Sequence, residues 1–240
     1  FFLDIVWMCK SSGIPVYIVG SDILKDFFAI FSVRHMNTFT ETGIILTKDD
    51  SLLFNKNLKH TIIGFNFWKL CGKDPVSSLV LSEFLSFVNK FFPNINLKQP
   101  KLPFYIFFRK KITDMYSQKN KNSEYIVVNP FCESQKIFAW FRLFKFNHYI
   151  NQIKTKAAVI CIGSKKDLRK SLGFQYHKDL RGQMTIFSLI EYLSTSNKVS
   201  VVTFDTFIAH LSILLDLDLT VFLKSTFKCS DITNRFIPFF

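Results

Sequence analysis

Apolar runs alternate with helix-like stretches along the second half of this 240-residue chain. Short apolar runs predict buried strands at Tyr125–Val128, Ala157–Ile162, Val199–Thr203 and Leu219–Leu223, the last of these being the final strand. Apolar residues recurring at helical spacing predict helices at Ile137–Ile153, Lys166–Leu172, Thr185–Leu193 and Phe207–Leu215. Strands that alternate with helices favour parallel pairing, so we expect a doubly wound α/β sheet, which binds ligands at the carboxyl ends of its strands.

The first half of the chain carries a weaker version of this pattern. The apolar run Ile14–Gly20 predicts a strand that ends in a glycine turn, and Ser21-Asp22 is expected to cap a helix over Ile23–Phe31. A second helix is expected to begin at Asp74-Pro75 and to stop at Pro93, because proline suits the first helical position but not the interior.

The most polar stretch of the chain, Arg109–Glu124, follows the apolar run Phe104–Phe108, which predicts another strand. This stretch has almost no periodicity, so we place a domain boundary in it. The chain is therefore expected to form a first domain over residues 1–122 and a second over residues 123–240.

Composition indicates a folded protein, and the net charge indicates which kinds of partner it could bind. Apolar residues make up 48% of the chain and charged residues only 20%, which excludes a disordered protein and allows a sizeable core. Lysine and arginine number 31 against 18 acidic residues, a formal net charge of +13. Such a charge suits nucleic acid, anionic lipid headgroups or nucleotide-linked substrates. The alternative is that lysine is simply the commonest surface residue.

Several classes of protein are excluded or unsupported. The five cysteines lie far apart and form no cluster with histidine that could bind zinc, and their odd number fits a reducing cytoplasm. The longest apolar candidate for a membrane span, Leu211–Leu223, is interrupted by Asp216 and Asp218 and is too short. The glycine fingerprints of nucleotide hydrolases and dinucleotide-binding proteins are absent, as is the nucleophile elbow of α/β-hydrolases.

Polar residues follow three of the predicted strands, in the segments Asn129–Lys136, Gly163–Asp167 and Asp205–His210. In the third segment Thr206 begins a helix, and His210 lies just over one turn into it. Carboxylate, hydroxyl, backbone N–H groups and imidazole can then face one crevice, and such a helix N-terminus holds phosphate without a metal. The alternative is that Asp205 and Thr206 only cap the helix while His210 packs.

Lys136 is a separate candidate in the loop after the first of these strands. It lies close to the start of the next helix, where its ammonium group can neutralise the charge of a diphosphate leaving group. In many enzymes a bound metal ion gives this electrostatic stabilisation. The alternative is a solvated surface lysine.

Taken together, the three strand ends resemble the heptosyltransferases of bacterial lipopolysaccharide synthesis, the family nine glycosyltransferases. The resemblance runs from about Tyr125 to Ser225. Its strongest part consists of two blocks separated by a spacer and a helix. The first block, Asp179-Leu-Arg-Gly, is similar to the family pattern D-L-x-G. The second, Val201-Val-Thr-Phe-Asp-Thr-Phe-Ile-Ala-His210, is similar to the family pattern v-v-x-x-D-T-G-x-x-H. Asn129-Pro130 with Lys136 resembles the family's N-P loop and its lysine.

This resemblance implies a GT-B architecture, in which two Rossmann-like domains with parallel sheets face each other across a cleft. Residues 1–122 would bind the acceptor and residues 123–240 the nucleotide sugar. The implied activity is transfer of heptose, or a related sugar, from an ADP-linked donor such as ADP-heptose to the inner core of lipopolysaccharide or lipooligosaccharide, with no metal or other cofactor. The implied location is cytoplasmic, in peripheral contact with the inner membrane where the anionic lipid-linked acceptor lies, and no nucleic-acid partner is expected.

The resemblance also implies which residues hold the phosphates and sugar of the donor. Asp205, Thr206 and His210 match the family motif and would bind them, while Lys136 would offset the diphosphate charge. Phe207 replaces the glycine of the motif, so its backbone N–H would make the phosphate contact there.

Two further donor residues, and one absence, follow from the same resemblance. Met184 would lie against the adenine, and Asp167 would bind the ribose. Family members open with a glycine-rich loop that bears the general base, whereas Asp4 and Asp22 stand outside that pattern, so no base is assigned. This predicts an incomplete N-terminal domain. It also leaves two alternatives: an inactive or truncated member that binds a sugar nucleotide or a partner protein only, and a nucleic-acid-binding α/β protein suggested by charge alone.

Overall fold

The computed structural model describes residues 2–19, 25–36, 43–46, 62–65, 82, 84–86, 88–90, 93–97, 104–116, 121–131, 139–154, 157–204, 206–223 and 235–238. The chain divides into two compact units, Phe1–Phe104 and Tyr105–Phe240. Along the sequence, this division after Phe104 comes earlier than the domain boundary expected after residue 122. Both units combine helices with parallel strands, which confirms the α/β class.

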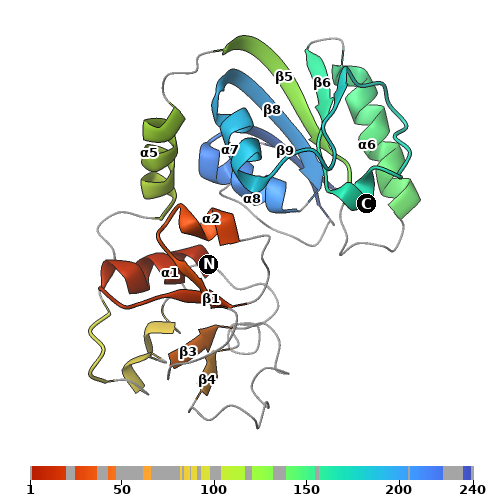
Figure 1. The fold of residues 1–240 in the computed structure, drawn as a ribbon. Helices are drawn as coiled ribbons and strands as arrows, with labels where there is room; N and C mark the ends of the chain where they lie inside the picture. Colours follow the sequence, from red (N-terminus) through yellow and green to blue (C-terminus); the bar gives the residue numbers. More distant parts are fainter. Residues whose placement is uncertain are drawn as a thin grey trace. The chain divides into compact units, whose positions relative to one another are not determined.

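The described part of the first unit contains two pairs of parallel strands (Figure 1). Strand β1 (Tyr17–Val19) pairs with β2 (Arg34–Met36), and β3 (Gly43–Leu46) pairs with β4 (Ile62–Phe65). Helix α1 (Phe2–Ser11) precedes β1, and helix α2 (Lys25–Ala29) connects β1 to β2. The strand and helix predicted within residues 14–31 are thereby confirmed, while their predicted cap at Ser21-Asp22 lies outside the described residues.

Aromatic side chains form much of the core of the first unit. The Phe104 ring lies 5.0 Å from that of Phe31 and 6.4 Å from that of Trp7, so the end of this unit packs against both α1 and the turn after α2. Phe84 and Val88, one helical turn apart, are also buried. The described residues around them, 82, 84–86 and 88–90, are helical as predicted, although the predicted start at Asp74-Pro75 lies outside the described part of the chain.

The second unit is built on a six-stranded sheet with the order β7-β6-β5-β8-β9-β10, in which every neighbouring pair is parallel. Its strands are β5 (Lys121–Asn129), β6 (Ala158–Cys161), β7 (Lys178–Asp179), β8 (Ser196–Phe204), β9 (Asp218–Leu223) and β10 (Arg235–Pro238). The chain runs outward from β5 to β7, then returns to β8 on the other side of β5 and runs outward again. The strand order therefore reverses between β5 and β8, and a doubly wound sheet binds its ligand beside that reversal.

Apolar side chains on both faces of this sheet are buried. On one face Phe146 and Ile150 of helix α6 (Ala139–Ile153) pack into a cluster with Val128 of β5 and Val202 of β8. Val201, whose side chain points to the opposite face, is fully buried as well. Helices α7 (Ile186–Ser194) and α8 (Phe207–Leu215) pack against β8 (Figure 1). The doubly wound architecture predicted for this half is confirmed.

The strand predicted at Phe104–Phe108 is wrong, because these residues begin helix α5 (Phe104–Tyr116). Phe104, Phe108 and Ile112 are buried at helical spacing, while Tyr105 and Ile106 between them are exposed. The first half of the polar stretch that was expected to lack regular structure, up to Tyr116, continues this helix, and its last residues from Lys121 begin β5. A short apolar run is compatible with either element, and here the helix-spaced burial decides.

Two further predictions in the second unit need correction. Instead of a helix over Lys166–Leu172, the chain forms only the short 3₁₀ helix η3 (Lys165–Asp167). Strand β9 is not the final strand either, because β10 pairs with its far side. Within the described residues, no helix combines the length and the apolar character needed to cross a bilayer.

Candidate functional site

The carboxyl ends of β5 and β8 lie side by side at the point where the strand order reverses. Asn129, the last residue of β5, is the register partner of Thr203 near the end of β8. Both residues are polar and buried, with 7% and 0% of their surface exposed. A buried polar pair at this position fits a site that binds a polar ligand, because a strand interior otherwise favours apolar side chains.

The junction between β8 and α8 carries the residues predicted to hold phosphate. The Thr203 hydroxyl donates to the carbonyl of Phe204 at 3.0 Å and lies 3.1 Å from the Thr206 hydroxyl. Thr206 occupies the N-cap position of α8 in extended conformation, and among the described residues its side chain bonds to Thr203 rather than to an N–H group of the helix. Asp205 lies outside the described residues, so its predicted role stays a prediction.

Helix α8 presents two of the predicted residues on its outer face. Ile208, Ala209, Leu211 and Ser212 are buried, whereas Phe207 and His210, three residues apart, are exposed on the same side. Phe207 is 38% exposed, so its ring lies outside the core. The imidazole of His210 is thus exposed rather than buried as in the alternative in which it packs, and it shares one face of the first turn with Phe207.

At the end of β6, Asp167 has a definite structural role. Its Oδ2 accepts hydrogen bonds from the Ser164 backbone N–H at 2.9 Å and from the Ser164 hydroxyl at 2.7 Å, and its Oδ1 forms an ion pair with Lys170. Burial acts to raise the pKa of Asp167, but the bonds from Lys170 and Ser164 outweigh it and hold that pKa below the usual range. The carboxylate closes this turn, and its predicted contact with ribose stays a prediction.

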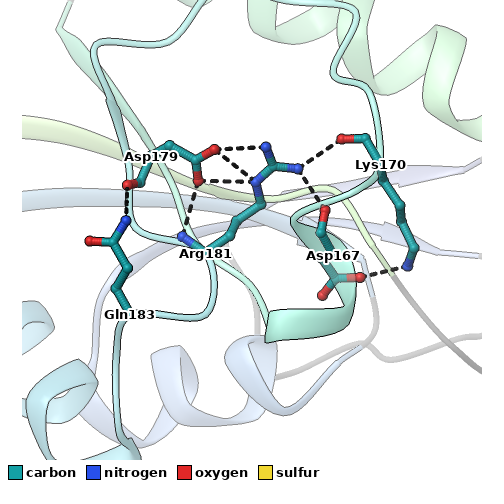
Figure 2. A network of polar contacts seen from close by, with 5 residues as sticks. All are labelled: Asp167, Lys170, Asp179, Arg181 and Gln183. Carbon is teal, nitrogen blue, oxygen red and sulfur yellow. Dashed lines mark hydrogen bonds and ion pairs between the residues drawn. The ribbon is translucent and has the colours of Figure 1, made fainter.

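A network centred on Arg181 joins the turn after β6 to the end of β7 (Figure 2). The Arg181 Nε donates to both carboxylate oxygens of Asp179, at 3.0 and 3.1 Å, and its Nη2 donates to Oδ2 at 2.7 Å. Its Nη1 donates to the backbone carbonyls of Asp167 at 2.7 Å and Lys170 at 2.8 Å. The Asp167 carbonyl also accepts the Lys170 N–H at 3.1 Å. The contacts of Arg181 thus hold the turn that stands where the helix over Lys166–Leu172 was predicted.

Arg181 and Asp179 stabilise each other's charged forms. The guanidinium holds the pKa of Asp179 below its usual range, chiefly through these hydrogen bonds, and Asp179 in turn raises the pKa of Arg181. The side chains of the pair are 6% and 24% exposed respectively, so the ion pair is shielded from water on the arginine side. Such a fork-shaped pair fixes geometry as well as charge.

Gly182 completes this network through its backbone. Its φ is +67°, a left-handed conformation that favours glycine, and its N–H donates to the carbonyl of Gly163 at 2.8 Å. A Cβ at residue 182 would lie 2.9 Å from Lys165 Cγ and 3.0 Å from Lys165 Cα. The Asp179-Leu-Arg-Gly182 block therefore fixes the loop after β6 against the loop after β7.

The loop after β5 reaches the same network. Phe131 donates its backbone N–H to the Asn129 side chain at 3.4 Å, and its ring lies 4.6 Å from the Lys170 ammonium and 5.9 Å from the Arg181 guanidinium. These distances fit cation–π contacts. The first two of the three predicted strand-end segments are thus brought together, but Lys136 lies outside the described residues.

Met184, the predicted adenine contact, is half-buried immediately before α7. The next residue, Thr185, forms a reciprocal cap with Ser188: the Ser188 N–H donates to the Thr185 hydroxyl at 3.1 Å, and the Thr185 N–H donates to the Ser188 hydroxyl at 2.8 Å. This cap fixes the chain on the carboxyl side of Met184. Its predicted role in binding the base stays untested.

The described part of the chain offers little for metal or covalent chemistry. It holds no group of three or more histidine, cysteine or acidic side chains that could bind a metal ion. Cys161 is fully buried, and burial raises the pKa of its thiol to about 12, so it is not a nucleophile at neutral pH.

Comparison with known proteins identifies the architecture. The sequence matches no protein-family model and no curated protein. Among solved structures, an E. coli heptosyltransferase determined with ADP, WaaC, superposes with a TM-score of 0.60 and 12% identity over 98% of this chain and 88% of that one. The chain has the GT-B fold of the heptosyltransferases. An E. coli ADP-heptose lipopolysaccharide heptosyltransferase II superposes on it with a TM-score of 0.53 and 12% identity, over 96% of this chain and 84% of that one.

Within this heptosyltransferase fold, one important residue was not predicted from the sequence. Arg181 occupies the variable position of the D-L-x-G pattern, yet it is the centre of the network in Figure 2. A signal for it exists, because an aspartate two residues before an arginine can accept the backbone N–H of that arginine, as Asp179 does at 3.0 Å. Its bonds to Asp167 and Lys170 depend on the tertiary fold and have no such signal.

Proposed function

We propose that this chain is a glycosyltransferase that moves heptose, or a related sugar, from an ADP-linked donor to the inner core of lipopolysaccharide or lipooligosaccharide. The observation that carries the proposal is the buried polar pair Asn129 and Thr203, which closes β5 and β8 where the strand order reverses in a heptosyltransferase fold. A solved structure with this fold contains ADP, which supports a nucleotide-sugar donor for this chain too.

In this proposal the first turn of α8 binds the donor phosphates. The N–H groups of that turn point towards the carboxyl edge of the sheet, and they favour an anion because of the helix dipole. Thr206 and His210 would add a hydroxyl and an imidazole, and Asp205 would bind the sugar. Lys136 would offset the diphosphate charge as the sugar leaves, so transfer would proceed without a bound metal.

The nucleoside would lie towards β6 and α7. We propose that Met184 contacts the adenine and that Asp167 contributes to ribose binding through the turn that it holds together. The acceptor would be an anionic lipid-linked saccharide bound by the first domain, at the cytoplasmic face of the inner membrane. The net charge of +13 supports a phosphorylated acceptor and peripheral contact with anionic lipid.

Nucleotide titration by calorimetry tests donor binding directly. We expect ADP to bind more tightly than UDP, and His210→Ala to weaken ADP binding about tenfold or more, as expected for a hydrogen bond to a charged group. His148→Ala is a matched control, since His148 is an exposed helical histidine whose ring bonds to Gln152 on the outside of α6. Absence of ADP binding by a well-folded sample would remove the proposal.

A second candidate function is donor binding without transfer. It is favoured by Phe207, whose exposed side chain stands where the family motif has glycine. Donor consumption with a lipid A–Kdo acceptor separates the two candidates, because release of ADP together with a glycosylated acceptor excludes the inactive alternative. Binding of ADP with no product under the same conditions would favour it.

A further inference from the structure

One loop of the second unit concentrates exposed positive charge. Residues 164–183, between β6 and α7, carry five exposed cationic side chains, namely Lys165, Lys166, Arg169, Lys170 and Lys178. The same segment carries two half-exposed apolar side chains, Leu168 at 48% and Tyr176 at 41%. We call this segment the basic loop.

The two acidic residues of the basic loop do not neutralise its surface. Asp167 is 7% exposed and is engaged by Ser164 and Lys170, while Asp179 is engaged by the buried Arg181. The cations Lys165, Arg169 and Lys178 therefore face solvent without an acidic neighbour among the contacts of the described residues. An exposed surface of this kind has a strong positive field.

The basic loop is also held in one shape. Arg181 bonds to the carbonyls of Asp167 and Lys170, and Gly182 bonds to Gly163 across the base of the loop. A surface that is already ordered loses little conformational entropy when it binds.

We propose that the basic loop docks on a bilayer of anionic phospholipids. Cationic side chains gain attraction from the headgroups, and Leu168, which lies between Lys166 and Arg169, can enter the boundary between headgroups and acyl chains. Leu168, the more exposed of the two apolar side chains, offers no flat face on which a base can stack, and Tyr176 suits the interface between headgroups and acyl chains, so the combination favours lipid and makes RNA binding an outcome of the test. The inference extends the proposed function, because a lipid-linked acceptor requires the enzyme to work at a membrane, but docking itself needs neither donor nor acceptor.

Vesicle co-sedimentation tests the proposal on the full-length chain. We expect binding to phosphatidylcholine vesicles that contain phosphatidylglycerol, little binding to phosphatidylcholine alone, and loss of binding as salt is raised. Lys165→Glu with Arg169→Glu should weaken partitioning by at least about 30-fold, because two cation contacts are lost and two repelled carboxylates are added. Leu168→Ser should weaken it by roughly fivefold.

The matched control is Lys25→Glu with Lys110→Glu, which makes the same change in net charge at exposed lysines of α2 and α5. It should retain most of the binding. Equal loss in the control, binding that ignores lipid charge, or tighter binding to RNA than to the anionic vesicles would each overturn the proposal. Titration of the same variants with ADP separates docking from donor binding, since a docking variant that still binds ADP leaves the proposed function intact.

Discussion

Replacing Arg181 with methionine removes every side-chain donor that Arg181 contributes to the network in Figure 2, while keeping most of the aliphatic volume. The guanidinium side chain is only 6% exposed, and it bonds to the Asp179 carboxylate and to the carbonyls of Asp167 and Lys170. Methionine would leave the carboxylate, 24% exposed, and two carbonyl oxygens without their partner. The substitution is therefore expected to destabilise the second unit.

The magnitude follows from the burial of the pair. Removing one partner of a buried ion pair costs about 3–5 kcal/mol, because the remaining charge is left without compensation. Since Asp179 retains 24% exposure, water can partly replace the arginine, and the lower end, about 3 kcal/mol, is expected. For a chain of this length, that corresponds to a fall in Tm of roughly 6–12 °C.

Thermal and urea unfolding followed by circular dichroism measure this loss. Arg181→Lys should lie between the wild type and Arg181→Met, because lysine keeps the charge but not the fork geometry. Arg169→Met is the matched control, an exposed arginine of the same loop, and should change stability by less than about 0.5 kcal/mol. Adding Asp179→Asn to Arg181→Met should recover part of the loss. If Arg181→Met is no less stable than Arg169→Met, the network does not hold the loop.

Three more predictions test other parts of the second unit. Gly182→Ala should cost at least about 1–2 kcal/mol in urea unfolding, because φ is +67° and the new Cβ would press on the Lys165 backbone. The pKa values of Asp167 and Asp179 are lowered in the folded state, so the stability that these carboxylates contribute is present above their unfolded pKa of about 4 and is lost as pH falls through the lowered values. Denaturation midpoints measured from neutral to acidic pH should show this decline. The midpoints of the wild type and of Asp179→Asn should converge in acid. Arg109 donates at 3.0 Å to two carbonyls at the end of α8, so Arg109→Ala should speed hydrogen exchange of the last turn of α8 about fivefold to tenfold, while α7 exchanges as before.

The regular elements of the second unit follow closely from local sequence. Helix α8 spans Phe207–Leu215 as predicted, because the apolar residues that follow Thr206 recur at helical spacing and are buried. The strands at its centre are equally readable, since continuous apolar runs flanked by polar residues indicate strands covered on both faces. The run Phe104–Phe108 was misread because five apolar residues fit a strand and a helix alike, and only the contacts of the next two turns decide between them.

The loops could not be predicted in this way. The conformation of residues 165–170 depends on carbonyl contacts with Arg181, which lies 11 and 14 residues beyond the two carbonyls that it bonds. The candidate site was partly predictable, because the β8–α8 junction combines a cap, a strand end and polar side chains within a few residues. That Asn129 stands directly beside Thr203 required the pairing of β5 with β8, which no local pattern specifies.

The two blocks that carry the family resemblance have different physical roles in this chain. The Asp179-Leu-Arg-Gly182 block lies at the edge of the sheet on β7, where its carboxylate, guanidinium and left-handed glycine are engaged by the chain itself. The second block ends β8 at the reversal of strand order and places the N-terminus of α8 at the carboxyl edge of the sheet, with His210 exposed in the first turn of that helix. The first block therefore supports the fold, whereas a claim of donor binding depends on the second. A variant that destroys the first block should lose ADP binding only together with stability, whereas His210→Ala should lose binding while the fold remains.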